Sequence, residues 1–376
     1  SVPTPALDRL ASESFVFDQY LLDSPDPRTV YRSLWQGVHA LNKSAEGVTL
    51  AEQFAAADWQ TTLISDDAQL FEDVSRAGFR DVNLLPSTED RTAESVSETG
   101  FARFFEAAVD AAAEVENSEL LWLHSRGMSA PWDAPYEFRE ELVEDEDEPS
   151  PPTTSTVPRV EDSTAIDPDD LLGLRRAYGG QIKLFDECLA AFLDVFHASG
   201  LHEDTLLVLV GTRGFPLGEH GSVGHCGAQL HEELVHAPCL VRFPDGTGAD
   251  ERSNGIAHPC DLGATLLDWA GRDTATSHGE SLLPLVRGDR FIARDRACMV
   301  AYDPAMQGCM PSELAIRTRF WHLRLDMQRE PAAEDSLAVR PLLYVKPDDR
   351  WEQNEISSRC PDQVDALRAA LDDFET

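Results

Sequence analysis

Two continuous apolar runs constrain the fold of this chain more than any other feature. Leu120–His124 reads LLWLH and Leu206–Val210 reads LLVLV, and segments with helical periodicity flank both runs. A strand that is apolar on both sides must be covered on both faces, as the strands of layered α/β proteins are. We therefore predict that roughly the first 270 residues form an α/β domain.

Periodicity predicts the remaining elements. Apolar residues recur at helical spacing in four segments, and a short apolar strand is predicted at Thr61–Ser65. Downstream, three segments alternate apolar and polar residues like antiparallel strands, and a closing helix follows. This pattern predicts a small α+β subdomain, with domain bounds of 1–290 and 291–376. The predicted helices are Pro5–Glu13, Val48–Trp59, Gly100–Val115, Leu171–Ser199 and Asp362–Phe374, and the predicted C-terminal strands are Arg296–Tyr302, Leu314–Leu325 and Leu342–Val345.

An acidic and proline-rich insertion interrupts the α/β pattern. Glu140–Glu148 reads EELVEDEDE, and PSPPTTSTVP follows directly. Charge repulsion and prolines disfavour regular structure in such a segment. We predict a flexible, solvated loop over 144–167, and the alternative is an acidic docking segment for a protein partner.

The charge of the chain excludes two classes of partner. The sequence holds 68 Asp and Glu against 31 Lys and Arg, a formal net charge of -37. Nucleic-acid binding needs clustered basic side chains, and anionic lipid repels an acidic surface, so we expect neither partner. No apolar run approaches the ~18 residues of a membrane span. No basic region followed by an apolar stretch opens the sequence, which favours a cytoplasmic location.

The segment 204–242 carries a resemblance to a known family. It reads DTLLVLVGTRGFPLGEHGSVGHCGAQLHEELVHAPCLVR, with LGEHG at Leu217–Gly221. This resembles the sulfatases of the alkaline phosphatase superfamily, in which a buried strand ends in T-S-D-H-G and L-G-E-H-G follows. Three further matches occur in the family's order, namely TPALDRLA at Thr4–Ala11, TLLDWAG at Thr265–Gly271 and GESLLPL at Gly279–Leu285.

The resemblance implies both a fold and a chemistry. The implied fold is an alkaline-phosphatase-like sandwich, with a central mixed, mostly parallel sheet between helices. Sulfatases use a formylglycine nucleophile, a divalent cation such as calcium on carboxylates, and Lys and His side chains on the sulfate. The family strand that bears two metal-binding Asp precedes the T-P-N-L-D-R-L-A motif. This sequence begins after the position of that strand, so the strand either lies upstream of the given sequence or, if it is truly missing, leaves the central sheet without a middle strand.

The nucleophile motif of the family, C/S-x-P-x-R, has a weak counterpart. Aligning on Arg28 places Ser24 at the nucleophile, but Asp26 stands where the family has Pro. The resemblance thus makes Ser24 and Arg28 the candidate catalytic residues. The alternative interpretation is that Ser24 is a turn residue.

Other family positions are replaced. The Lys and His of G-K-W-H fall on Asp66 and Ala68, and the His of H-x-P falls on Ser129. The Asp-His metal pair falls on Thr212-Arg213, and the later Lys falls on His225. Loss of one preorganised donor costs ~10²–10³ in rate, so several losses predict no ordinary sulfatase activity.

Arg213 and His225 are the predicted anion-binding residues. With Arg28 they would form an oxyanion pocket, because guanidinium groups match the oxygens of sulfate and phosphate. In the alternative interpretation, Arg213 pairs with an acidic residue that maps to the same site and fills the pocket. The acids in question are Asp23, Asp26 and Asp66.

The remaining histidines do not predict a metal site. We interpret His220 as a turn residue and His124 as a core histidine. His225, His231 and His236 suggest zinc, but no carboxylate or Cys has matching spacing. The expectation is therefore that the chain holds no metal and no other cofactor.

The sequence supports three functions. The first is a sulfatase-like protein without catalysis, which would act as a binding or regulatory homologue. Its partners would be a sulfate- or phosphate-bearing ligand and another protein. The second is a divergent sulfate or phosphate ester hydrolase that uses Ser24 or another nucleophile. The third is an interaction module that uses the acidic insertion. The first two differ in whether Ser24, Arg28, Arg213 and His225 converge on one open cavity.

Overall fold

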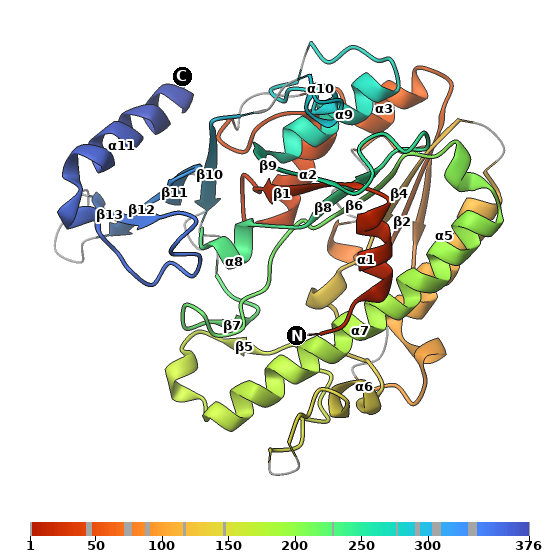
Figure 1. Cartoon of the computed structure of the whole chain (residues 1–376), viewed down its shortest axis with the longest axis horizontal. Coiled ribbons are helices and arrows are strands. Elements are labelled where there is room, and N and C mark those ends of the chain that lie inside the picture. The colour runs from red at the N-terminus through yellow and green to blue at the C-terminus, as the bar shows by residue number, and fades with distance from the viewer. Residues whose placement is uncertain are drawn as a thin grey trace.

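The computed structural model divides into a layered α/β part and a C-terminal antiparallel sheet with a helix on it (Figure 1). In the view of Figure 1, the C-terminal sheet and its helix lie at the left, and the layered part fills the centre and right. The described residues are 2–42, 47–70, 77–86, 91–115, 118–145, 148–227, 229–275, 277–289, 294–302, 310–329 and 337–375.

The strands of the α/β part form two sheets and a short ribbon. One sheet is mixed, with the order β6-β8-β1-β9, in which β1 runs antiparallel to β8 and parallel to β9. The other is parallel, with the order β3-β2-β4. The strands are β1 (Phe15–Tyr20), β2 (Gln60–Ser65), β3 (Asp81–Leu84), β4 (Glu119–His124), β6 (Leu207–Val210), β8 (Cys239–Arg242) and β9 (Glu251–Ala257), with a ribbon of β5 (Arg159–Val160) and β7 (Val223–Gly224).

Helices cover both faces of these sheets. Successive residues of β1 point to opposite faces, so that Phe15 and Phe17 join one apolar cluster and Val16 joins the other. Helices α2, α3, α9 and α10 contribute to the first cluster, and α1, α5 and α7 contribute to the second. Their bounds are α1 (Pro5–Ser12), α2 (Pro27–Gln36), α3 (Leu50–Ala55), α5 (Gly100–Ala113), α6 (Tyr136–Glu140), α7 (Pro168–Ala198), α8 (Glu232–Val235), α9 (Pro259–Trp269) and α10 (Leu283–Val286).

Local sequence explains where α2 begins and ends. The Asp26 side chain accepts a hydrogen bond from the Thr29 N–H, and Pro27 occupies the first turn, where its missing N–H costs nothing. The helix ends at Gly37, which has a φ of 64°, a conformation that glycine adopts without strain. None of the helices in the described ranges has the length and apolar composition of a membrane-spanning segment.

The C-terminal part is a four-stranded meander with one helix on it. Its order is β10-β11-β12-β13, every pair is antiparallel, and the apolar face of α11 covers the sheet through Val364, Leu367 and Leu371. Its elements are β10 (Arg296–Tyr302), β11 (Pro311–Thr318), β12 (Trp321–Arg329), β13 (Leu337–Val345) and α11 (Pro361–Glu375). The α+β character predicted for the tail is confirmed.

Two predicted segments differ from the structure. The predicted helix at Val48–Trp59 is only six residues long, because Asp58 adopts a φ of 64° shortly after it. The predicted strand at Leu314–Leu325 is a hairpin, because a two-residue turn separates β11 from β12. The alternation of apolar and polar residues continues through such a turn. Periodicity alone therefore does not reveal that the segment is two strands.

Part of the acidic insertion packs against α7 and α6. The Arg176 side chain donates to the Pro149 carbonyl at 2.9 Å, and it also pairs with Glu148. Arg139, which is fully buried, donates to the carbonyls of Pro152 and Thr154 at 2.6 and 2.8 Å. Two buried guanidinium groups therefore hold a segment for which the sequence predicts a solvated loop.

Candidate functional site

Polar side chains from α2, β4 and β6 meet at one edge of the sheets. Because β2 and β4 run parallel, their carboxyl ends lie at the same edge, where open α/β sheets place ligands. His124 ends β4, and its Nδ1 is hydrogen-bonded to the hydroxyl of Tyr31. The same hydroxyl is hydrogen-bonded to the side chain of Thr212, which follows β6.

A carboxylate extends this chain of polar groups. His124 Nε2 lies 3.6 Å from Asp67 Oδ2. Burial alone would raise the pKa of Asp67, but the neighbouring His124 outweighs it and the pKa is lowered. Burial raises the pKa of Tyr31 well above its ordinary value. Asp67, His124, Tyr31 and Thr212 therefore form a relay of polar groups, and Asp67 is ionised at neutral pH.

Three arginines surround His225. Partial burial and the positive charges of Arg213, Arg159 and Arg126, in that order, lower the pKa of His225. Arg213 donates to the carbonyl oxygen and the Sγ of Cys226, both at 3.3 Å. We call Arg126, Arg159, Arg213 and His225 the arginine cluster. Arg159 also lies 3.8 Å from Glu161, so the positive charge of the cluster is partly compensated in a chain of net charge -37.

The structure brings two of the four residues predicted for the site into one cluster. Arg213 and His225 lie together in the arginine cluster. Ser24 is buried, with only 1% of its surface exposed, and its Oγ accepts a hydrogen bond from the Asp26 N–H at 3.3 Å. Arg28 is exposed in the first turn of α2. The catalytic assignment of Ser24 and Arg28 and the anion-binding assignment of Arg213 and His225 remain predictions.

The acids proposed to pair with Arg213 have other partners. Asp23 accepts from a hydroxyl of α2 at 2.5 Å and from a backbone N–H at 2.9 Å. Asp26 caps α2, and Asp66 accepts the backbone N–H of Arg126 at 2.7 Å. Among the described residues, no carboxylate forms an ion pair with Arg213. The guanidinium is therefore not neutralised in the way that the filled-pocket interpretation expects.

Arg126 is the member of the arginine cluster that lines a hollow of about 410 Å³, a volume that includes open solvent. Its walls also contain Asp66 and Ser125 from the loops after β2 and β4, together with Asp133 and Gln181. The Nε atom of Arg126 is buried and lacks a hydrogen-bond partner in the described part of the chain. An anion in this region would supply the acceptor that this atom lacks.

Sequence reasoning missed three residues of this region. Arg126 directly follows the LLWLH strand, and the rule that ligands bind beyond the carboxyl ends of strands would have selected it. Tyr31 lies on the buried side of α2, where an aromatic residue indicates core packing. Arg159 lies in the insertion, and no sequence signal indicated that β5 brings it to the site.

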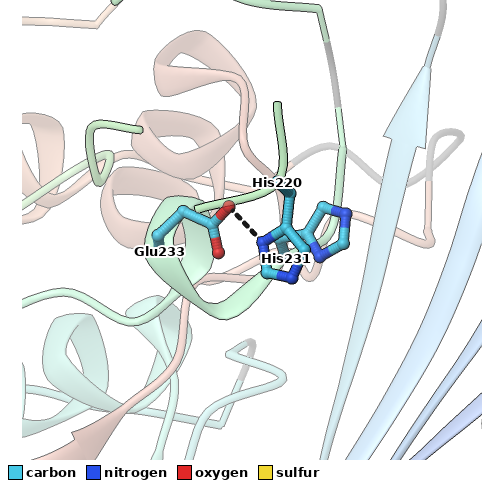
Figure 2. Close-up of side chains that lie close together, drawn as sticks. All are labelled: His220, His231 and Glu233. Carbon is cyan, nitrogen blue, oxygen red and sulfur yellow. Dashed lines mark hydrogen bonds and ion pairs between the residues drawn. The ribbon is translucent and has the colours of Figure 1, made fainter. Parts of the chain in front are cut away.

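A second cluster lies between the α/β part and the C-terminal sheet. Figure 2 shows His220, from the loop after β6, with His231 and Glu233 at α8. His220 Nδ1 lies 2.7 Å from Glu233 Oε1, and the two imidazole rings stack with centroids 3.6 Å apart and planes 14° apart. One potential ligand atom from each residue lies within 4.8 Å of the others.

This cluster offers the donors of a transition-metal site. Two imidazoles and one carboxylate are typical zinc ligands, whereas calcium takes oxygen ligands only. The cluster therefore does not match a calcium site built from carboxylates. The rings are nearly parallel, so their in-plane lone pairs do not converge, and one ring must turn before both bind one ion. Arg324 Nη1 lies 2.6 Å from His231 Nδ1 and must also withdraw.

The donor set predicts which ion the cluster prefers. Zinc is expected to raise the melting temperature more than calcium does, because imidazole nitrogen suits borderline metals. The variant His220→Asn should lose the zinc effect, and His236→Asn, which lies outside the cluster, should keep it. Thermal melting with metal analysis of the dialysed protein measures both effects. A calcium effect equal to that of zinc would contradict the prediction.

Solved structures define the class to which this fold belongs. A protein solved in complex with its substrate D-glucosamine-2-N,6-O-disulfate superposes with a TM-score of 0.76 at 16% identity, covering 99% of this chain and 92% of that one. The phosphonate monoester hydrolase of Agrobacterium radiobacter gives a TM-score of 0.72 at 16% identity, with the same coverage. The predicted alkaline-phosphatase-like fold is confirmed.

The family follows from the sequence itself. The model of the sulfatase family matches residues 1–272, and the chain belongs to the sulfatase family. The N-acetylglucosamine-6-O-sulfatase of Bacteroides thetaiotaomicron is 29% identical over 115 residues, which are 30% of this chain and 20% of the relative. The alkaline phosphatase superfamily protein PehA of Trinickia caryophylli is 27% identical over 123 residues, 32% of this chain and 24% of the relative. The chain thus spans a quarter or less of these curated relatives.

The expectation that the chain holds no metal is wrong. It belongs to a family that uses a divalent cation, and the structure gathers three potential ligands at His220, His231 and Glu233. His220, which we interpreted as a turn residue, is one of them. Sequence spacing grouped His231 with His225 and His236, because it did not show that His220 stacks on His231.

Proposed function

We propose that this sulfatase-family chain is a binding or regulatory homologue that recognises a sulfate- or phosphate-bearing ligand at the arginine cluster. The observation that carries the proposal is that three guanidinium groups, those of Arg213, Arg159 and Arg126, lie close enough to one imidazole to act on it, and together with its partial burial they lower the pKa of His225. Repulsion among like charges is unfavourable unless an anion neutralises them, so a doubly charged group is the natural ligand.

The geometry of Arg213 supports this proposal. Its hydrogen bonds to Cys226 involve a neutral carbonyl and a thiol, and these leave its charge uncompensated. Arg126 adds a buried Nε without a partner among the described residues. Guanidinium groups form paired hydrogen bonds with sulfate and phosphate oxygens, so both side chains have donors available for the ligand.

The position of Ser24 supports a function without ordinary catalysis. A nucleophile must reach the ester that the site binds, but Ser24 is buried and its Oγ accepts a hydrogen bond from its own loop. The family positions for the metal pair and the later Lys carry Thr212, Arg213 and His225. Arg213 and His225 can bind an anion at these positions, whereas the metal ligands and the Lys that the family uses there are replaced.

The relay of Asp67, His124, Tyr31 and Thr212 favours a second function, a divergent ester hydrolase. A carboxylate beside an imidazole that contacts a hydroxyl is a common way to activate a nucleophile. Tyr31 is only 3% exposed, so this function requires the site to open. The two functions differ in their outcome, because a binding protein leaves the ester intact and a hydrolase releases sulfate or phosphate from it.

The experiment that tests the proposal combines binding and turnover. Glucosamine 6-sulfate is titrated into the protein by calorimetry, with uncharged glucosamine as the matched control, and release of sulfate is followed with and without added zinc or calcium. We expect saturable binding of the sulfated sugar, competition by inorganic phosphate and no sulfate release. Sulfate release at a rate above background would establish the hydrolase instead. Equal binding of both sugars would refute the arginine cluster as the site.

A further inference from the structure

The second half of the acidic insertion forms a strap with fixed contacts. We call residues 148–167 the strap, and the structure describes all of them. Its first part is anchored beside α6 and α7, where the buried side chains of Arg139 and Arg176 donate to its carbonyl groups. The Trp132 N–H adds a hydrogen bond to the Ser155 carbonyl at 2.7 Å, and Ser155 is buried. The strap is therefore held in place although its composition is that of a loop.

The far part of the strap docks on the loop that carries His225. Arg159 lies opposite Gly224 in the ribbon of β5 and β7, and the two strands lie side by side in Figure 1. The His225 N–H donates to the Pro158 carbonyl at 2.8 Å. These backbone contacts place the strap directly against the arginine cluster, independently of any charge.

Gly224 is the residue that allows this close approach. Its φ of 80° is one that glycine adopts without strain. A Cβ atom at this position would lie 1.9 Å from the carbonyl oxygen of Pro158 and 2.7 Å from its carbonyl carbon. Carbon atoms that are not bonded to each other lie ~3.5–4.0 Å apart. Any side chain at this position therefore forces the strap and the loop to separate.

The strap carries one of the three guanidinium groups of the arginine cluster. Arg126 and Arg213 follow β4 and β6, whereas Arg159 belongs to the strap. The Arg159 side chain is 71% exposed, and its one ion pair among the described residues, with Glu161, is exposed as well. Exposed ion pairs contribute little, so most of the charge of Arg159 remains available to an anion.

We propose that the strap determines the specificity of the anion site, in which Gly224 positions the strap and Arg159 favours the more highly charged ligand. This inference rests on the proposed function of the arginine cluster. A phosphate monoester carries about 1.5–2 negative charges at neutral pH, whereas a sulfate ester is a monoanion. Because the Coulomb energy scales with charge, Arg159 favours the phosphate monoester over the sulfate ester of the same sugar. Arg159 contacts the ligand, and Gly224 is a positioning residue because it acts through Arg159.

Calorimetric titration with a matched pair of ligands tests the role of Arg159. Glucosamine 6-phosphate and glucosamine 6-sulfate differ only in the anionic group, and the parent should bind the phosphate more tightly. At low salt, Arg159→Gln should weaken binding of the phosphate about tenfold and of the sulfate about threefold, and added salt should reduce both losses because Arg159 is exposed. Equal losses for the two ligands, or no loss, would overturn the inference. A parent protein that binds neither ligand would refute the proposed function itself.

The variant Gly224→Ala tests the positioning role. Its Cβ displaces the Pro158 carbonyl, so the His225 amide loses its acceptor and should exchange with solvent about tenfold faster. The losses in ligand binding should match those of Arg159→Gln. The double variant should bind no more weakly than Arg159→Gln alone, because the effects of residues that act through each other do not add. A glycine with a merely structural role would add a separate loss.

Gly200→Ala is the matched control for backbone strain. Gly200 has a φ of 82° beyond the end of α7, and no atom of the described chain lies within 4 Å of a Cβ built there. This variant should bind both ligands like the parent. If Gly224→Ala does not fold, as judged by circular dichroism, the comparison of the two ligands in Arg159→Gln decides. Additive losses in the double variant, unchanged exchange at His225, or equal weakening by Gly200→Ala would each overturn the positioning role of Gly224.

Discussion

Replacement of Glu352 by Gln is expected to lower the free energy of unfolding by about 3–5 kcal/mol, the range for removal of one partner from a buried ion pair. The Glu352 side chain is fully buried. It accepts hydrogen bonds from His322 Nδ1 at 2.5 Å and His231 Nδ1 at 2.9 Å, and it lies 3.2 Å from Lys346 Nζ. Gln keeps the shape of the side chain but removes its negative charge, so the positive charge of the buried Lys346 is less well neutralised.

The pH dependence of this loss identifies its cause. The neighbours of Glu352, with His322 foremost, outweigh the effect of burial and hold its pKa well below 4.5. A depressed pKa adds stability that is present above the unfolded value and is lost as pH falls from about 4.5 toward the folded value. The parent should therefore lose stability over this acidic range more steeply than the Glu352→Gln variant.

Urea unfolding followed by circular dichroism at several pH values measures both effects. The matched control is Asp348→Asn, which removes the same charge at an exposed position in the same loop. It should change the free energy of unfolding by less than about 0.5 kcal/mol, as surface substitutions do. A loss in Glu352→Gln no larger than that of the control would contradict the prediction.

Local sequence patterns predicted the fold well because the strands are long apolar runs. Leu120–His124 and Leu206–Val210 became β4 and β6, and helical spacing found α5 and α7. These patterns depend on neighbours within a few residues, so one sequence is sufficient to find them. The strand order of the two sheets depends on pairing between segments far apart in the chain, which periodicity does not report.

The candidate sites were less predictable because their partners are distant in sequence. Arg213 and His225 were found from their positions in the sulfatase motif. The partners of His231 are Glu352 and Arg324, from the C-terminal sheet and the loop after it. No spacing rule connects residues 93 or 121 positions apart, and only the packing of the meander against α8 brings them together.

The second large effect is expected in the arginine cluster. Each of Arg126→Gln and Arg213→Gln should weaken binding of glucosamine 6-sulfate about tenfold to a hundredfold, since a charge-assisted hydrogen bond contributes about 1.5–3 kcal/mol. The double variant should bind at least a hundredfold more weakly than the parent. Arg319→Gln removes the same charge from an exposed turn of the C-terminal sheet and should bind normally.

The pH dependence of binding shows whether His225 belongs to this site. Partial burial and the charges of Arg213, Arg159 and Arg126 lower its pKa below 6.5, so the free protein holds His225 neutral at pH 7. A bound dianion opposes that repulsion and raises the pKa, so binding takes up a proton and affinity should increase as pH falls from 7 toward 5. Calorimetry in buffers of different ionisation enthalpy measures this proton uptake. Affinity that does not change with pH in the parent, or that changes equally in His225→Gln, would remove His225 from the site.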